Sequence, residues 1–307
     1  MADGRFAPSP TGPLHLGNLR TALVAWLFAR SSSGRFLVRM EDLDLVTADP
    51  AHEAQQLGDL AALGLDWDGE VVRQSDRFDR YRAAIDRLTE RGLTYPCYCT
   101  RREIREAARA PHDGPVPDGA YPGTCRDLRA GERRRREADG RRPALRLRAQ
   151  VASVGFVDRL AGPYEALVDD LVLRRNDGVP AYNLAVVVDD AAQGVDEVVR
   201  GDDLLSSTPR QIHLARLLDM PVPSYAHVPL VLGPEGRRLA KRDGAVTLAE
   251  RPEPPPSVRD RLAASLGLIE ADEHAEPAAL IERFDPERLS RSPWRLEPGD
   301  LAPVDQP

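Results

Sequence analysis

Residues 4–18 read Gly-Arg-Phe-Ala-Pro-Ser-Pro-Thr-Gly-Pro-Leu-His-Leu-Gly-Asn, and they are the part of the sequence most informative about the fold. Its first five residues predict a short strand, and a Gly-Pro turn at 12–13 leads into a helix predicted over about 15–30. Apolar residues of this helix recur at a spacing that gives it a core-facing stripe: Leu16, Leu19, Leu23 and Trp26. Residues 34–40 predict a second strand. Strand, helix and strand in this order indicate a βαβ unit, and therefore an α/β fold with a parallel sheet.

The rest of the chain predicts that this sheet is interrupted by an insertion. Helices are expected at 50–63 and 75–92. The composition from 95 to 180 then shifts to Arg, Pro, Gly and Asp, with short strand candidates at 144–149 and 153–158. The apolar run 181–188 predicts that the sheet resumes there, followed by a strand at 197–200 and a helix at 208–218.

The expected organisation thus has four parts. Residues 1–94 form the first half of a split, Rossmann-like domain, 95–180 an inserted subdomain, and 181–250 the second half. Residues 251–307 form a short C-terminal segment with one or two helices, which begins with a stiff proline-rich linker at 251–256.

Composition narrows the class of protein. The 307 residues are 42% apolar and 30% charged, and no apolar run approaches the ~18 residues of a membrane span. The first residues resemble no export signal, so we expect a cytoplasmic protein without membrane association.

The net charge of -7 hides a basic region, because 101–148 holds fourteen arginines against eight acidic residues. Its Arg-rich part, 129–148, is either a surface for a nucleic-acid backbone or a solvated helix face.

Two positions are suited to phosphate chemistry. The stretch 8–18 joins a strand to a helix N-terminus, where free N–H groups and the helix dipole favour anions. Gly12 and Gly17 allow a ligand to approach the backbone, and His15 can donate to phosphoryl oxygens, although a lone histidine there is more often a cap. Lys241 is the only lysine among 42 basic residues, which favours a position that needs a compact ammonium.

These two positions carry a resemblance to a known family. Residues 8–18 resemble the "HIGH" signature of class I aminoacyl-tRNA synthetases, in the form found in glutamyl-tRNA synthetases, with Asn18 in place of the second histidine. Residues 238–242, Arg-Leu-Ala-Lys-Arg, resemble the Lys-Met-Ser-Lys-Ser signature. The resemblance implies that His15 and Lys241 are catalytic. It also implies that ATP, with Mg²⁺, binds at four residues: His15, Gly17, Asn18 and Lys241.

A site for L-glutamate needs two cationic contacts and one anion, since the ligand has two carboxylates and an ammonium. The resemblance implies five binding residues: Arg5, Ser9, Glu41, Tyr182 and Arg200. Glu41 and Ser9 are assigned to the ammonium, and Arg5 with Tyr182 to one carboxylate. Arg200 is assigned to the other carboxylate.

The three cysteines fall close together, at 97, 99 and 125, which favours reduced thiols over a disulfide framework. Tetrahedral zinc needs four ligands, so either Tyr121 or His112 would complete a structural zinc site with Cys97, Cys99 and Cys125. The resemblance favours Tyr121. The alternative to a zinc site is that the three cysteines are small, buried, apolar side chains that bind no metal.

The resemblance extends from about residue 4 to 249. Complete glutamyl-tRNA synthetases continue past the lysine signature into helical domains that read the anticodon, whereas about sixty residues follow it here. This pattern resembles the glutamyl-queuosine tRNA(Asp) synthetase family, which transfers glutamate to the queuosine base in the anticodon loop of tRNA(Asp). The implied partners are ATP, L-glutamate and queuosine-bearing tRNA(Asp), with a monomer expected. Three alternatives are a truncated ligase that charges a tRNA 3′ end, a non-catalytic tRNA-binding paralogue and, less favoured, a glutamine-specific enzyme.

Overall fold

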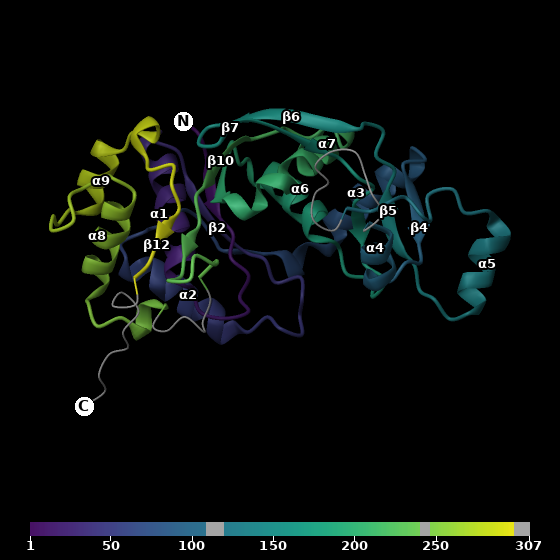
Figure 1. The fold of residues 1–307 in the computed structure, drawn as a ribbon, viewed down its shortest axis with the longest axis horizontal. Coiled ribbons are helices and arrows are strands. Elements are labelled where there is room, and N and C mark those ends of the chain that lie inside the picture. Colours follow the sequence, from purple (N-terminus) through teal and green to yellow (C-terminus); the bar gives the residue numbers. More distant parts are fainter. Residues whose placement is uncertain (109–119, 240–245, 298–307) are drawn as a thin grey trace.

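A five-stranded parallel sheet forms the centre of the molecule (Figure 1). The structure is a computed structural model, and it describes residues 1–108, 120–239 and 246–297. The strands lie in the order β10, β9, β1, β2, β3, with these bounds: β10 Ser224–Val228, β9 Glu197–Gly201, β1 Gly4–Phe6, β2 Phe36–Met40 and β3 Val72–Arg73. The chain therefore reverses its direction of strand addition between β1 and β9, which are neighbours in the sheet.

The predicted βαβ unit is confirmed. β1 and β2 pair in parallel, and α1 (Leu16–Ser31) connects them. The four residues of the predicted apolar stripe are all buried, and α1 is also buried on the opposite side because helices from the C-terminal part cover it. The helices that follow are α2 (Pro50–Ala62) and α3 (Phe78–Glu90), close to their predicted ranges.

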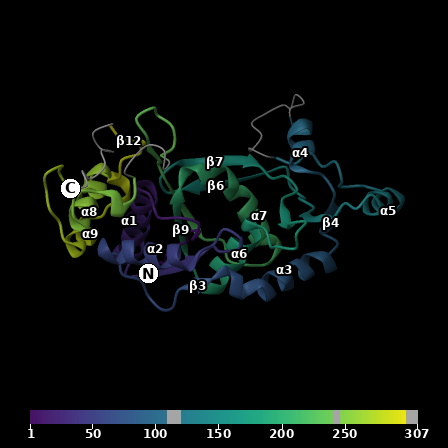
Figure 2. The ribbon, with the colours of Figure 1, turned by 90° about the horizontal axis from the view of Figure 1, so that it is seen from below.

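The segment between α3 and α6 builds two small antiparallel sheets. One has three strands, in the order β4 (Thr94–Cys97), β5 (Ala144–Leu147) and β8 (Val172–Arg174). The other is the hairpin of β6 (Ser153–Asp158) and β7 (Gly162–Leu167), which lies along α7 (Thr208–Leu217) in Figures 1 and 2. Two further helices, α4 (Arg101–Ala108) and α5 (Ala130–Ala138), belong to this segment, and α5 lies at one end of the molecule.

The prediction that the sheet resumes at 181–188 is wrong, because α6 (Tyr182–Gln193) occupies this run. Every residue from Leu184 to Asp190 is buried, since α3, α7 and β8 surround the helix. A helix covered on all sides needs no polar face, so its apolar run resembles that of a buried strand. The sheet resumes at β9.

The last described part of the chain packs against α1. It contains α8 (Pro255–Ser265), α9 (Pro277–Arg283) and β12 (Trp294–Arg295), and β12 pairs in parallel with β11 (Val231–Leu232). The prediction of a stiff linker over 251–256 is wrong at its end, because prolines at 255 and 256 form the first turn of α8, where proline is well tolerated. Within the described ranges, no helix has the length and apolarity needed to cross a bilayer.

Candidate active site

A cavity of about 520 Å³ opens at the carboxyl ends of the parallel strands, beside the point where β1 and β9 meet. Ligands of open α/β sheets bind at such a reversal of strand order. We call it the first cavity. Its wall includes residues from the loop after β1, the end of β2, the end of β9 and the start of α1 and α6: Arg5, Ser9, His15, Gly17, Asn18, Glu41, Tyr182 and Arg200. All the residues assigned from the sequence to glutamate or ATP, except Lys241, therefore lie around one space.

The N-terminus of α1 holds His15 in a defined orientation. His15 Nδ1 accepts a hydrogen bond from Asn18 N at 3.2 Å, and Asn18 Oδ1 accepts one from His15 N at 3.2 Å. Burial, with the positive charge of Arg238, lowers the pKa of His15 to about 4. The ring is therefore neutral at pH 7, and because Nδ1 accepts, the proton lies on Nε2. A Cβ at Gly17 would lie 3.0 Å from the His15 ring, so glycine leaves the ring its space.

Arg5 is tied to a buried network that the sequence did not predict. Arg5 Nε and Nη2 donate to the two carboxylate oxygens of Asp190, at 3.2 and 3.3 Å. Asp190 also accepts from Arg39 Nη1 at 2.7 Å, and Arg39 reaches Glu41 Oε1 at 3.4 Å. Burial opposes the charge of Asp190, but Arg5 and Arg39 overcome it and lower its pKa. Much of the Arg5 charge is thus already balanced by the protein.

Arg200 has one nitrogen left for a ligand. Its Nε donates to His227 at 3.1 Å and its Nη2 to Thr208 Oγ1 at 2.8 Å. The side chain is 5% exposed, and its Nη1 is buried without a hydrogen-bond partner in the structure. Buried polar atoms are rarely left unpaired in a folded protein, so Nη1 is an unused hydrogen-bond donor on a residue that borders the first cavity.

A larger cavity of about 1050 Å³ adjoins the first and shares Ser9, Thr11, Glu41 and Tyr182 with it. We call it the second cavity. Its arginines outnumber its acidic residues and are Arg101, Arg141, Arg142, Arg146 and Arg175, against Glu41 and Asp44. If part of an anionic macromolecule entered the second cavity, it would lie next to a ligand bound in the first cavity.

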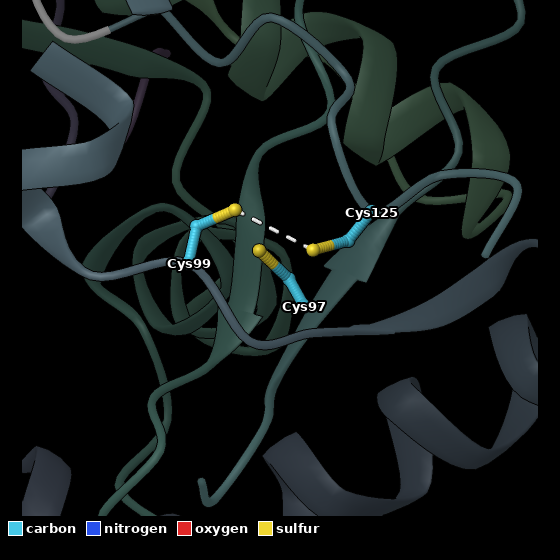
Figure 3. Close-up of side chains that lie close together, drawn as sticks. All are labelled: Cys97, Cys99 and Cys125. Atoms are coloured by element: carbon cyan, nitrogen blue, oxygen red, sulfur yellow. Dashed lines mark hydrogen bonds between the residues drawn. The ribbon is translucent and has the colours of Figure 1, made fainter. Parts of the chain in front are cut away.

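The side chains of the three cysteines point toward one another, as Figure 3 shows. Cys97 and Cys99 also line the second cavity. Their Sγ atoms all lie within 4.8 Å of one another, and the Tyr121 hydroxyl lies 3.4 Å from Cys97 Sγ and 3.8 Å from Cys99 Sγ. Tetrahedral zinc with Zn–S bonds of ~2.3 Å sets its sulfur ligands about 3.8 Å apart. Hydrogen bonds from Cys125 and Cys99 lower the pKa of Cys97, whereas hydrogen bonds to Cys125 and Cys97 raise the pKa of Cys99, and burial raises the pKa of Tyr121. The four side chains fit a zinc ion.

Two predicted residues lie outside the described residues. His112, the other fourth ligand considered, falls in 109–119, and Lys241 falls in 240–245. The described residues that flank Lys241 lie beside the first cavity: Arg238 borders it, and Val246 O accepts a hydrogen bond from Leu16 N at the start of α1, at 2.8 Å.

Comparison with known families agrees with this geometry. The model of the family "tRNA synthetases class I (E and Q), catalytic domain" matches residues 2–295. The chain belongs to this family of class I tRNA synthetases. It is 62% identical to a glutamyl-Q tRNA(Asp) synthetase from Nocardia farcinica, over 99% of this chain and 96% of the relative. The corresponding protein of Symbiobacterium thermophilum is 49% identical, over 98% of both chains.

A solved structure of a class I synthetase shares the fold. The crystal structure of a glutamate tRNA ligase from Elizabethkingia meningosepticum, in complex with its amino acid, aligns with a TM-score of 0.80 and 26% identity. The alignment covers 97% of this chain and 67% of the ligase. The chain is therefore a ligase-type aminoacyl-transfer enzyme of the class I synthetase family, with a glutamate- and tRNA-related activity.

Sequence reasoning missed the residues that hold this synthetase site in place. Gln56 of α2 donates to the carbonyl oxygens of Ser9 and Gly12, at 3.0 and 2.7 Å, and so fixes the loop after β1. Asp190 holds Arg5 from the far end of α6. A pair of aspartates directly after the apolar run 184–188 was the available signal, because buried acidic residues are rare unless they are paired.

Proposed function

We propose that the enzyme activates L-glutamate with ATP as glutamyl-adenylate and then transfers the glutamyl group to the queuosine base of tRNA(Asp). In the first step a glutamate carboxylate oxygen attacks the α-phosphorus of ATP, and pyrophosphate leaves. In the second step a hydroxyl of the base attacks the adenylate carbonyl, loses its proton and displaces AMP. One observation supports the first step above all: the first cavity combines two buried arginines with a helix N-terminus that presents a neutral histidine.

The amino-acid end of the first cavity offers complementary charges. The unpartnered Nη1 of Arg200 would bind one carboxylate, and Arg5 with Tyr182 the other. Because Asp190 balances Arg5, we expect Arg200 to provide the stronger contact. Glu41, with Ser9, would receive the ammonium; burial raises the pKa of Glu41, and a bound ammonium would counteract this shift.

The nucleotide end lies at α1. The Nε2–H of His15 and the positive end of the helix dipole would bind phosphoryl oxygens, since Leu16 N and Asn18 N already donate to Val246 O and His15 Nδ1; Gly17 leaves the histidine ring its space. Mg²⁺ would arrive with ATP, and Lys241 would neutralise the charge that develops on pyrophosphate as it leaves.

Exchange of labelled pyrophosphate into ATP tests this activation directly. We expect exchange that depends on L-glutamate and is far weaker with L-glutamine, which lacks the second carboxylate and would leave a buried arginine unpaired. Equal exchange with both amino acids would contradict the assignment of two arginines to two carboxylates. The alternative of a non-catalytic binding protein predicts no exchange with either.

The second cavity supports the choice of tRNA as acceptor. Its arginines would neutralise phosphates, and its shared wall with the first cavity would bring a base to the adenylate. The names of the two relatives support tRNA(Asp) as that RNA, since the similarity covers nearly all of both chains. We propose that the anticodon arm binds here, guided by the basic region at 101–148.

This docking predicts a salt-dependent contribution from α5. Arg133 and Arg136 have partners within the protein, Leu128 O and Cys125 Sγ, whereas Arg134 and Arg135 are exposed. Replacing Arg134 and Arg135 with Ala should weaken tRNA binding and flatten its dependence on log salt by ~0.7 to 0.9 per lost contact. Glutamate activation without tRNA should not change.

Binding isotherms at several salt concentrations measure this slope. The double variant Arg283→Ala, Arg288→Ala removes two exposed arginines near α9, at the opposite end of the molecule, and is the matched control. If both double variants change the slope equally, α5 has no special role and the basic region is a solvated helix face.

We further propose a structural zinc ion held by Cys97, Cys99, Tyr121 and Cys125, which would stabilise a segment with little core of its own. Protein purified without added metal should contain about one equivalent of zinc per chain. Tyr121→Phe should weaken zinc retention against a chelator more than His112→Ala does. Elemental analysis measures both. Less than about a tenth of an equivalent, with no recovery on adding zinc, would instead favour buried thiols.

A further inference from the structure

Arg200 donates hydrogen bonds to two residues that do not border the first cavity, His227 and Thr208. His227 of β10 is the register partner of Arg200 on the neighbouring strand β9. His227 Nε2 lies 3.1 Å from Arg200 Nε and 3.1 Å from Thr208 Oγ1. Because Arg200 Nε always carries a hydrogen, this bond requires a free lone pair on His227 Nε2.

Asp158 sets the tautomer of His227. This residue ends β6, in the hairpin that packs along α7, and its Oδ2 lies 2.6 Å from His227 Nδ1. The other oxygen, Oδ1, accepts hydrogen bonds from three backbone N–H groups, those of Leu160, Ala161 and His227, at 2.8 to 3.1 Å. The carboxylate is therefore fixed in place, and as an acceptor it requires the proton on Nδ1. Arg200 Nε therefore donates to His227 Nε2, and His227 Nδ1 donates to Asp158 Oδ2.

The surroundings keep His227 neutral and immobile. The ring is 1% exposed, and burial lowers its pKa, with Arg200 acting in the same direction. Burial works against the charged form of Asp158, but the hydrogen bonds from His227 and the backbone outweigh it and lower its pKa. Tyr225 lies parallel to the His227 ring, and Phe156 meets it edge-on. The ring thus has one protonation state and one orientation.

We propose that Asp158 and His227 are positioning residues that hold the Arg200 guanidinium at the wall of the first cavity, and that they thereby determine the affinity for the amino-acid carboxylate. The inference rests on the proposed function, in which Arg200 binds that carboxylate. Holding an arginine in its bound geometry removes the entropy cost of ordering it when the ligand arrives. Without the acceptor on His227, Arg200 Nε would be buried and unpaired, and the guanidinium would turn to find another partner.

The test separates positioning from folding with three variants. His227→Leu removes the acceptor, whereas His227→Gln can place an amide oxygen near the position of Nε2. Asp158→Asn is nearly isosteric, but its amide N–H would face Nδ1 and move the imidazole proton to Nε2. In pyrophosphate exchange, we expect His227→Leu and Asp158→Asn to raise the KM for glutamate by ~10- to 100-fold, as loss of a hydrogen bond to a charged group does. The KM for ATP should change little, and His227→Gln should recover most of the glutamate affinity.

Nitrogen NMR of the histidine side chains gives a second readout. His227 should be protonated on Nδ1 in the wild type and on Nε2 in Asp158→Asn, while the thermal midpoint remains close to that of the wild type. An unchanged KM for glutamate in both His227→Leu and Asp158→Asn would overturn the inference. The inference would also be overturned if the KM for glutamate and the KM for ATP rose together and if all three variants, His227→Gln included, lost stability. That is the behaviour of a purely structural residue. Wild-type protein without glutamate-dependent exchange would instead refute the proposed function, and the inference would fall with it.

Discussion

Replacing Lys241 with Ala should lower the rate of glutamate-dependent pyrophosphate exchange by ~10²-fold or more, because a transition-state charge contact is lost. Negative charge accumulates on the bridging oxygen as pyrophosphate leaves, and an ammonium group can neutralise it. Lys241 is the only lysine in the chain, and the described residues on both sides of its segment lie beside the first cavity. The rate should fall more than the affinity for ATP, since the contact strengthens in the transition state.

Two further variants define the cause of this loss. Lys241→Arg keeps the charge but replaces the compact ammonium with a planar guanidinium, so we expect it to restore activity only in part. Arg237→Ala removes a charge from the preceding loop, where Arg237 is exposed and pairs with Glu235, and should leave exchange nearly unchanged. Exchange at the wild-type rate in Lys241→Ala would remove Lys241 from the mechanism.

The parts of the fold that could be predicted from the sequence are those with local signals. The loop of 8–18 contains its own turn residues, cap and helix start, so both the βαβ unit and the position of His15 followed from it. The convergence of the three cysteines could be predicted because an odd number of cysteines, close together in the sequence, favours a metal site over disulfide bonds. The apolar run at 181–188 was wrongly predicted as a strand, since a helix buried on all sides lacks the periodicity that separates helix from strand.

The supports of the site were not predictable for a physical reason. Asp190 meets Arg5 across 185 residues, and Asp158 meets His227 across 69, so no local pattern relates them. Asp190 and Asp158 matter because they accept hydrogen bonds in a low-dielectric interior. There, the loss of one acceptor leaves a buried charged group unpaired.

The requirement for queuosine should be close to all-or-none. Adenylate formation gives an activated carbonyl, and transfer then needs a nucleophilic hydroxyl within reach of it. An unmodified guanine has no such hydroxyl, so backbone contacts in the second cavity would bind the unmodified tRNA(Asp) without producing transfer. Binding should therefore be similar for the two RNAs, whereas the yield of product should differ completely.

Incubation with ATP, Mg²⁺, labelled glutamate and purified tRNA(Asp) distinguishes transfer to the queuosine base from charging of the 3′ end. The RNA is supplied in three forms: queuosine-bearing, queuosine-bearing without its 3′-terminal adenosine, and unmodified. We expect glutamate to be transferred to both queuosine-bearing forms and not to the unmodified RNA. Equal transfer to modified and unmodified tRNA(Asp), or transfer that requires the terminal adenosine, would contradict the account and identify a ligase that charges the 3′ end.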